Sequence, residues 1–296
     1  MLTLPIDSNA KAQFAHDGFL IFDNLLETTM LEPLREAMAA SFDGKWETGL
    51  APDEVNWRPG HPDHVTRQIC NVWKASRTLA SVILSAKAGQ AVAALNGWPG
   101  TRVAQDNLLH KPAEKDGVAG GTLGMHQDSA FADWADPSLM CTVWLALDDV
   151  SRAGGTLEFA RSSHKWAAAP PIDEFHNPTA YRSAFEAAAA RQGIVDPEMA
   201  YVEVPAGGGS IHHGWTWHGS GPNKTGRPRR AIAIHCISSD AVFTDQVGYI
   251  YSRYKQLGSN RMDEGFFPII WHESGHRSAF IAPFLAGNLA WHACGS

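Results

Sequence analysis

The chain has 296 residues, of which 44% are hydrophobic and 10% aromatic, so it can bury a large core within one elaborated domain. Its 24 basic and 31 acidic residues give a net charge of -7. Because the sequence has no basic stripe of the kind that binds a phosphate backbone, nucleic acid is not expected as a partner.

Residues 1–100 are predicted to be mainly helical. Leu31, Leu34 and Met38 are spaced for one helix face, and the apolar residues of 79–86 repeat the pattern. A short strand is predicted at 19–22, before these helices. We therefore expect a helical region at about 1–100.

From about residue 101 the hydrophobic period changes to two, which predicts strands. One strand face is expected to consist of Val103, Gln105, Asn107 and Leu109. Residues 141–146 alternate in the same way. Further strands, separated by Gly- and Pro-containing turns, are predicted at 156–159, 201–204, 209–213 and 231–237.

Short strands with frequent turns indicate a sandwich or jelly roll. We expect one domain over 1–296, in which the helical region packs on a β core of about 101–240. A helix at 180–192 interrupts the strands, and the chain after 244 is predicted to be helical or irregular. The insertion 167–192 is a candidate substrate lid, although surface helices commonly have no such role.

The sequence Gly124-Met125-His126-Gln127-Asp128 contains a candidate metal-binding pair. Residues two apart in an extended backbone project to the same side, so His126 and Asp128 can bind one ion. With a further histidine they would form a 2-His-1-carboxylate triad, which leaves coordination positions open on Fe(II). The H-x-D pattern alone is weak evidence, since a histidine near an aspartate usually marks a solvated turn.

The third ligand is expected on a later strand, where His212, His213 and His218 are available. We choose His218, because a turn-rich segment follows it and leads to Arg229 and an apolar strand. This order predicts a hairpin that brings Arg229 near the metal, where its guanidinium would bind the distal carboxylate of 2-oxoglutarate. Arg227 is a possible substitute, and His212 and His213 are interpreted as core or surface residues.

Several separated motifs resemble the phytanoyl-CoA dioxygenase family of Fe(II)/2-oxoglutarate-dependent oxygenases. The resemblance runs from about Phe14 to Cys236. It is carried by FAHDGFL at 14–20, LLHKP at 108–112, HQD at 126–128, TVWLALDD at 142–149, GGTL at 154–157, SSHK at 162–165 and HGSGPNKT at 218–225 with Arg229. It implies a mainly β fold with flanking helices, the double-stranded β-helix or cupin-like jelly roll.

The resemblance also implies residue roles. His126, Asp128 and His218 would bind Fe(II), and the expected co-substrates are 2-oxoglutarate and O2. The residues implied along the co-substrate pocket are Ser220, Arg229, Trp144, Gln105 and Lys111. Ser220 would assist the co-substrate carboxylate that Arg229 anchors. Trp144 could equally supply packing area in the core, and His164 is taken as structural.

The implied activity is a dioxygenase that hydroxylates, or otherwise oxidises, an unactivated C–H bond of a small-molecule metabolite while 2-oxoglutarate is decarboxylated to succinate and CO2. Asp128 favours this reaction over halogenation, since related halogenases keep that position small for chloride. Desaturation and cyclisation branch from the same chemistry. The acidic charge balance gives no support to a CoA thioester. The alternative is a non-catalytic or Zn-dependent cupin-like protein that binds or isomerises a small molecule.

The cysteines and the two ends of the sequence indicate where in the cell the protein is expected. Cys70, Cys141, Cys236 and Cys294 form no C-x-x-C pair, which indicates neither a disulfide framework nor a structural zinc site. The first residues lack the apolar core of a secretory peptide, and no stretch is expected to be apolar enough to span a membrane. The last residues do not form a peroxisomal address. We expect a cytoplasmic protein with no membrane partner.

Overall fold

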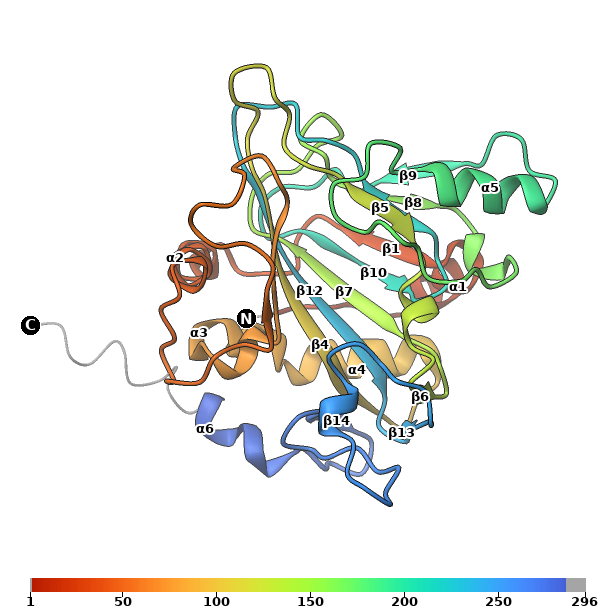
Figure 1. Cartoon of the computed structure of the whole chain (residues 1–296). Helices are drawn as coiled ribbons and strands as arrows, with labels where there is room; N and C mark the ends of the chain where they lie inside the picture. Colours follow the sequence, from red (N-terminus) through yellow and green to blue (C-terminus); the bar gives the residue numbers. More distant parts are fainter. Residues whose placement is uncertain (1, 286–296) are drawn as a thin grey trace, which may run out of the picture.

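The structure is a computed structural model that describes residues 2–285 and contains two facing antiparallel sheets (Figure 1). The strands of the larger sheet are β1 (Phe19–Phe22), β2 (Glu54–Val55), β3 (Arg67–Cys70), β4 (Gly100–Lys111), β7 (Cys141–Ala146), β10 (Gly209–His213), β12 (Arg229–Ser238) and β14 (Ile269–His272). Those of the smaller sheet are β5 (Leu123–His126), β8 (Leu157–Ala160), β9 (Met199–Tyr201) and β11 (His218–Ser220). A separate pair consists of β6 (Ala135–Asp136) and β13 (Val242–Phe243).

The strand orders are β1-β10-β7-β12-β4-β3-β2 in the larger sheet, with β14 beside β4, and β5-β11-β8-β9 in the smaller sheet. The α-helices are α1 (Ser8–Asp17), α2 (Leu31–Phe42), α3 (Arg77–Ile83), α4 (Ala86–Asn96), α5 (Ser183–Arg191) and α6 (Ala282–Leu285). The 3₁₀ helices are η1 (Thr28–Met30), η2 (Val72–Lys74), η3 (Asp128–Phe131), η4 (Ser163–Lys165), η5 (Ser252–Tyr254) and η6 (Ala279–Ile281). This mainly β architecture with flanking helices confirms the predicted jelly roll.

Helices cover the outer face of the larger sheet, and α3 and α4 run beneath it in Figure 1. Their apolar faces, with Leu79 and Val92 fully buried, pack with the outward side chains of β7 and β12 in one core cluster. A second cluster, which includes Trp144 and Phe159, fills the space between the two sheets. The functional cavity described below lies in that space.

The stretch Arg77–Asn96 differs from two expectations. A single helical pattern was expected across 79–86, whereas α3 ends at Ile83 and α4 begins at Ala86. No stretch was expected to be apolar enough to span a membrane. By length and by its mean hydropathy of 1.4, however, this helical stretch could cross one. In the structure 56% of its most apolar window is buried, as is usual for a helix in the core of a globular protein.

The turn between α1 and β1 explains the sequence Asp-Gly at 17–18. Gly18 has φ 87°, and a Cβ there would lie 2.4 Å from His164 Nδ1 and 2.5 Å from Thr216 Oγ1. A glycine is therefore required for both the left-handed backbone and the close packing. The turn leads into β1, which matches the predicted strand at Phe19–Phe22.

Other strand predictions need correction. A strand was expected at 201–204, but β9 covers Met199–Tyr201. The expected β4 face also breaks, since the register shifts between His235, opposite Gln105, and Cys236, opposite Val103. The extra β4 residue forms a bulge that turns Val103 into the helix-side core. Gln105 and its alternate neighbours Asn107 and Leu109 instead line the cavity.

The predicted hairpin from His218 to Arg229 is wrong. β11 pairs with β5 and β8 in the smaller sheet, whereas β12 pairs with β4 and β7 in the larger one. The turn-rich segment between them crosses from one sheet to the other. Arg229 still approaches the end of β11 at Ser220, because the two sheets face each other across the cavity.

Candidate metal centre

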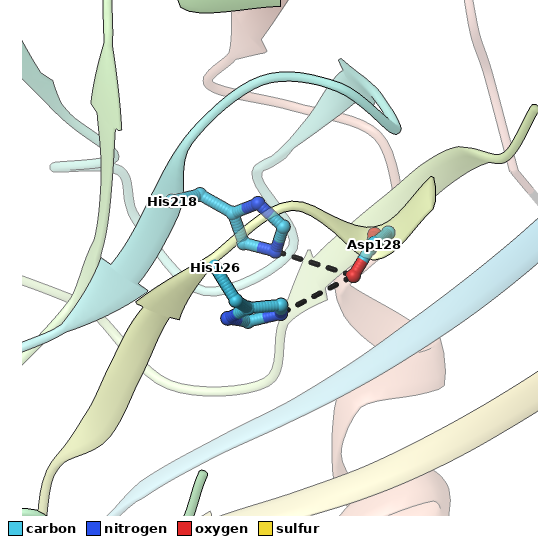
Figure 2. A group of neighbouring side chains, drawn as sticks. All are labelled: His126, Asp128 and His218. Carbon is cyan, nitrogen blue, oxygen red and sulfur yellow. Dashed lines mark ion pairs between the residues drawn. The ribbon is translucent and has the colours of Figure 1, made fainter. Parts of the chain in front are cut away.

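Three buried side chains from two neighbouring segments meet at one point of the cavity. β5 ends at His126, the chain turns into η3 at Asp128, and β11 begins at His218, which pairs with His126 in the sheet. Figure 2 shows both imidazoles directed toward the carboxylate. The Nε2 atoms of His126 and His218 lie 3.3 and 3.4 Å from Asp128 Oδ1. The three ligand atoms are close enough to hold one metal ion.

Backbone carbonyls fix the orientation of both imidazoles. His126 Nδ1 lies 2.8 Å from the carbonyl oxygen of Gly124, and His218 Nδ1 lies 2.9 Å from that of Thr216. Since a carbonyl oxygen only accepts, both Nδ1 atoms carry a proton, so each ring in its neutral form presents the lone pair of Nε2 to a metal. The site thus offers two imidazole nitrogens and a carboxylate oxygen, the donor set of a 2-His-1-carboxylate centre.

The electrostatics of the site favour an ionised carboxylate. Burial alone would raise the pKa of Asp128, but the charges of His218 and His235 and hydrogen bonds from His126 and His212 hold it well below its usual range. Burial and His218 lower the pKa of His126. Although burial opposes it, Asp128 raises the pKa of His218. A divalent cation would replace the positive charge that His218 supplies in the free site.

The second oxygen of Asp128 has three neighbours that the sequence analysis did not assign. Oδ2 lies 2.6 Å from Thr142 Oγ1, 3.2 Å from His212 Nε2 and 3.3 Å from His235 Nδ1. His212 was interpreted as a core or surface residue, and it is indeed buried, but directly beside the centre. His235 could have been found by extending the period of two from Arg229 along β12, since both line the cavity.

His213 and His164 lie away from the metal centre. Their ring centroids are 5.3 Å apart, beside α1, and His164 Nε2 contacts the carbonyl oxygen of Ala15 at 3.2 Å. Burial lowers the pKa of His213 to about 4. Both are therefore neutral histidines of the packing around α1, as the sequence interpretation expected.

A second cluster gathers two cations around one hydroxyl. Ser220 Oγ lies 2.8 Å from Lys111 Nζ and 3.3 Å from Arg229 Nη2, and Lys111 also donates to the carbonyl oxygen of Gly221. All three side chains are buried. A hydroxyl accepts two hydrogen bonds and donates one, so Ser220 keeps its own proton available for an anion.

Arg229 is only partly satisfied by the protein. Its Nη2 donates to the carbonyl oxygen of Gly155 at 3.0 Å, while Nε and Nη1 are buried without a hydrogen-bond partner among residues 2–285. Burial lowers the pKa of Arg229 to about 10, and burial together with Arg229 lowers that of Lys111 well below its ordinary value. Buried cations with unpaired donors fit a carboxylate ligand, which would supply both the charge and the acceptors.

Trp144 and Gln105 occupy different parts of the cavity. The guanidinium carbon of Arg229 lies 5.6 Å from the Trp144 ring centroid, and both residues line the cavity, so Trp144 borders the anion cluster. Gln105 is six residues from Lys111 on β4, roughly 20 Å at the usual strand rise. Its amide contacts Asn107 and Cys70. The structure therefore places Gln105 far from Lys111 and from the expected co-substrate end of the cavity.

The cavity has a volume of about 540 Å³ and is open to solvent on one side. Val247 and Tyr249, which are 85% and 67% exposed, border it together with residues 171–173 and 175–176. Among the described lining residues Arg229 is the only lysine or arginine, and the carboxylates besides Asp128 are Asp133 and Asp173. The entrance is thus apolar and acidic.

The predicted lid segment divides into two parts. Residues 171–173 and 175–176 line the cavity, whereas α5 packs behind the smaller sheet, where Phe185 contacts the cluster of Met125 and Trp217. In Figure 1 α5 lies on the outer side of β5, β8 and β9. Only the loop that precedes α5 is thus positioned to touch a bound molecule.

Comparison with known proteins gives a consistent picture. The model of the family described as Phytanoyl-CoA dioxygenase (PhyH) matches residues 14–231. A relative in Caenorhabditis elegans, described as a probable phytanoyl-CoA dioxygenase, is 28% identical over 137 residues, which cover 45% of this chain. The matched region amounts to 41% of that relative's own length.

Two solved structures share the fold over most of the chain. The carbocyclase SnoK of nogalamycin biosynthesis has a TM-score of 0.69 and 18% identity and covers 89% of this chain and 96% of its own. The epimerase SnoN, solved with Fe3+, alpha ketoglutarate and nogalamycin RO, has a TM-score of 0.66 and 19% identity, with 88% and 96% covered. At these identities the likeness concerns the fold.

Proposed function

This chain belongs to the phytanoyl-CoA dioxygenase family of iron- and 2-oxoglutarate-dependent oxygenases, and we propose that it hydroxylates an unactivated C–H bond of a small-molecule metabolite. The observation that carries the proposal is the combination of a buried His-Asp-His cluster with a buried arginine whose Nε and Nη1 have no partner in the described part of the chain. A metal-binding cluster alone would suit many functions. The adjacent anion site makes a carboxylate-bearing co-substrate the simplest occupant.

The donor set suits Fe(II). His126, Asp128 and His218 would hold the ion and leave positions for 2-oxoglutarate and O2. Arg229 would bind the distal carboxylate of 2-oxoglutarate, with Ser220 as an additional donor. When bound, iron and 2-oxoglutarate supply an oxidant for the C–H bond: one oxygen atom of O2 enters the product, and the other enters the succinate formed with CO2.

The protein itself acts mainly by positioning and by excluding water. Hydrogen abstraction from carbon needs no acid or base from the chain, so the rigid strands β5, β11 and β12 would serve to hold ligands and co-substrate in fixed relation. Buried Trp144 and Phe159 keep the space between the sheets apolar. Lys111 would hold Ser220 and add positive charge beside the co-substrate carboxylate.

The cavity favours a neutral substrate of moderate size. Apart from the metal centre, Arg229 and the apolar residues, its wall carries amide, imidazole and phenol groups, contributed by Gln68, Gln105, Asn107, His176, His235 and Tyr251. A CoA thioester carries several phosphates and would need basic residues near the entrance, where Asp133 and Asp173 stand instead. A small metabolite or biosynthetic intermediate with hydrogen-bonding groups is therefore the proposed substrate class.

Other outcomes of the same chemistry define the alternatives. The carbocyclase and epimerase of similar fold make ring closure and epimerisation the natural competitors of hydroxylation. A non-catalytic or zinc-dependent cupin-like protein is the alternative from another class. The unpartnered donors of Arg229 argue against it, since a zinc isomerase has no need for a dicarboxylate.

The experiment is a coupled assay with Fe(II), 2-oxoglutarate and a library of small neutral metabolites. Oxygen consumption and succinate are measured together, and products are identified by mass. We expect slow succinate formation without substrate and a stoichiometric increase with the correct one, accompanied by a mass gain of one oxygen. If the protein forms no succinate above a metal-free control under any condition, the oxygenase proposal is refuted.

A further inference from the structure

Asp128 uses its two carboxylate oxygens differently. Oδ1 lies toward the Nε2 atoms of His126 and His218, as the dashed lines of Figure 2 show. Oδ2 is turned away from them and receives a hydrogen bond from Thr142 Oγ1 at 2.6 Å. The carboxylate thus has one oxygen free for a metal and one held by the protein.

Thr142 is the last donor in a chain of hydrogen bonds that runs along the cavity wall to Asp128. In order from the far end, its members are Tyr251, Gln105, Asn107, His235, Thr142 and Asp128. The side-chain distances after the first contact are 2.6 Å from Gln105 to Asn107, 3.0 Å from Asn107 to His235 and 2.9 Å from His235 to Thr142. Four elements, β4, β12, β7 and η3, and the loop that contains Tyr251 contribute, so the fold rather than local sequence assembles the chain.

The chemistry of the groups sets one direction for the chain. An ionised Asp128 only accepts, so the single hydroxyl proton of Thr142 points to Oδ2. Thr142 Oγ1 must then accept from His235 Nδ1, so Nδ1 carries a proton, and the other ring nitrogen, Nε2, lies 3.0 Å from the Asn107 amide nitrogen. Gln105 Nε2 donates to Asn107 Oδ1, and the Tyr251 hydroxyl donates to Gln105 Oε1. Every member donates toward the carboxylate, an arrangement in which the bonds strengthen one another.

His212 adds a further contact to the same oxygen. Its Nε2 lies 3.2 Å from Oδ2, and its Nδ1 is buried with no partner among the described residues. The ring packs between Phe159 and His218, with centroid distances of 5.1 and 4.3 Å. His212 thus contacts Oδ2 through one ring nitrogen, in addition to the hydrogen bond that Oδ2 receives from Thr142.

We propose that Thr142 and His235 are positioning residues that hold Oδ2 of Asp128 and thereby fix the orientation in which Oδ1 faces the metal. A carboxylate that bound through both oxygens would occupy a coordination position that the open triad reserves for co-substrate or O2. To rotate Oδ2 onto the metal, the protein would have to break the bond from Thr142 and leave that donor and His235 buried and unpaired. The inference rests on the proposed function, because it presupposes that the triad binds a metal.

The same residues form the wall that a substrate would contact. Gln105, Asn107, Thr142 and His235 line the cavity, and Tyr251 joins them from the segment that borders the entrance. The hydrogen bonds that orient the metal ligand are therefore continuous with the substrate side of the cavity. Nothing comparable links Asp128 to the Arg229 end, among the hydrogen bonds of the described residues.

The test compares Thr142→Val with Thr142→Ser, using Mn(II) as the probe and anaerobic equilibrium binding with and without 2-oxoglutarate. Valine keeps the shape but removes the hydroxyl, so we expect Mn(II) affinity to fall about 10- to 100-fold, the usual range for loss of a residue that orients a metal ligand. Serine keeps the hydroxyl and should recover wild-type affinity to within about threefold. Thr101→Val is the matched control. It removes a buried hydroxyl near the start of β4 that is hydrogen-bonded to the Gly89 carbonyl oxygen.

A second variant covers the case in which Thr142→Val does not fold. His235→Leu cuts the chain one bond earlier, and we expect it to weaken Mn(II) binding while the melting temperature shows a folded protein. If wild type binds no Mn(II), the proposed function fails. If wild type binds and either folded variant, Thr142→Val or His235→Leu, binds equally well, or if serine does not rescue a folded valine variant, the positioning role is overturned.

Discussion

The two ends of the cavity are built on opposite principles. At the Arg229 end, two buried cations share one hydroxyl, and two guanidinium nitrogens have no partner among residues 2–285. At the other end, the side chains of Gln105, Asn107 and His235 are hydrogen-bonded to one another. Unpaired buried charge is unfavourable until a ligand compensates it. The first end is thus suited to an anion. The second end would select a substrate by its shape and by the hydrogen bonds that it can form.

Asp128→Ala would have the largest effect, because it removes the ligand that lies between the two ends. We expect succinate formation to drop to background, since the two histidines alone hold iron weakly. The measurement is 2-oxoglutarate-dependent succinate production at saturating Fe(II). Asp240→Ala, at an exposed position after β12, is the control and should keep wild-type turnover. Full turnover in Asp128→Ala would show that the ligand assignment is mistaken.

Arg229→Ala should selectively disable the anion end. Loss of charge-assisted hydrogen bonds predicts a rise of about 10- to 100-fold in the 2-oxoglutarate concentration needed for half-maximal rate. Metal affinity measured without co-substrate should change little, because Arg229 contacts none of the three ligands. Steady-state kinetics and Mn(II) titration separate the two effects. An unchanged requirement for 2-oxoglutarate in this variant would mean that the anion binds elsewhere.

Lys111→Met tests the Arg229 end of the cavity through the pH dependence of 2-oxoglutarate binding. Burial and Arg229 lower the pKa of Lys111 in the free protein, and a bound dicarboxylate would favour its charged form again. Binding should therefore take up a proton once the pH exceeds the lowered pKa, so that 2-oxoglutarate affinity falls as the pH rises. The variant should bind about 3- to 10-fold more weakly at neutral pH and lack this slope. Calorimetry in buffers of different ionisation enthalpy measures the proton uptake, and equal uptake in both proteins would contradict the assignment.

Tyr251→Phe should have the smallest effect on the metal and co-substrate. Tyr251 is four hydrogen bonds away from Thr142 and five away from Asp128, and only its donation to Gln105 is lost. We expect Mn(II) and 2-oxoglutarate affinities within about threefold of wild type. Parallel binding titrations check this result. A loss as large as that of Arg229→Ala would show that the two ends are not separate.

The period-two pattern was sufficient to predict the principal strands. β1 and β10 occur at the predicted residues, and residues 141–146 alternate between the helix-side core and the cavity. What the pattern could not supply was strand pairing. The hairpin from His218 to Arg229 was assumed from sequence proximity, but pairing depends on contacts with β5, β8, β4 and β7, which are distant in sequence.

The same limitation applies to the site. His126, Asp128 and His218 were selected by spacing and resemblance, and the structure brings them together. Thr142 and His235 were overlooked because their contact with Asp128 arises from the register of β7 and β12, where they lie opposite each other. A bulge in β4 likewise changed the side of Val103 without any sequence mark such as Gly or Pro.

Anaerobic titration of the wild-type protein with Fe(II) and then 2-oxoglutarate tests the central claim most directly. If the triad binds iron and the co-substrate chelates it with its far carboxylate on Arg229, a weak visible charge-transfer band should appear only when both are present, and Arg229→Ala should require more 2-oxoglutarate to produce it. A wild-type protein that binds both components and develops no band would contradict the account.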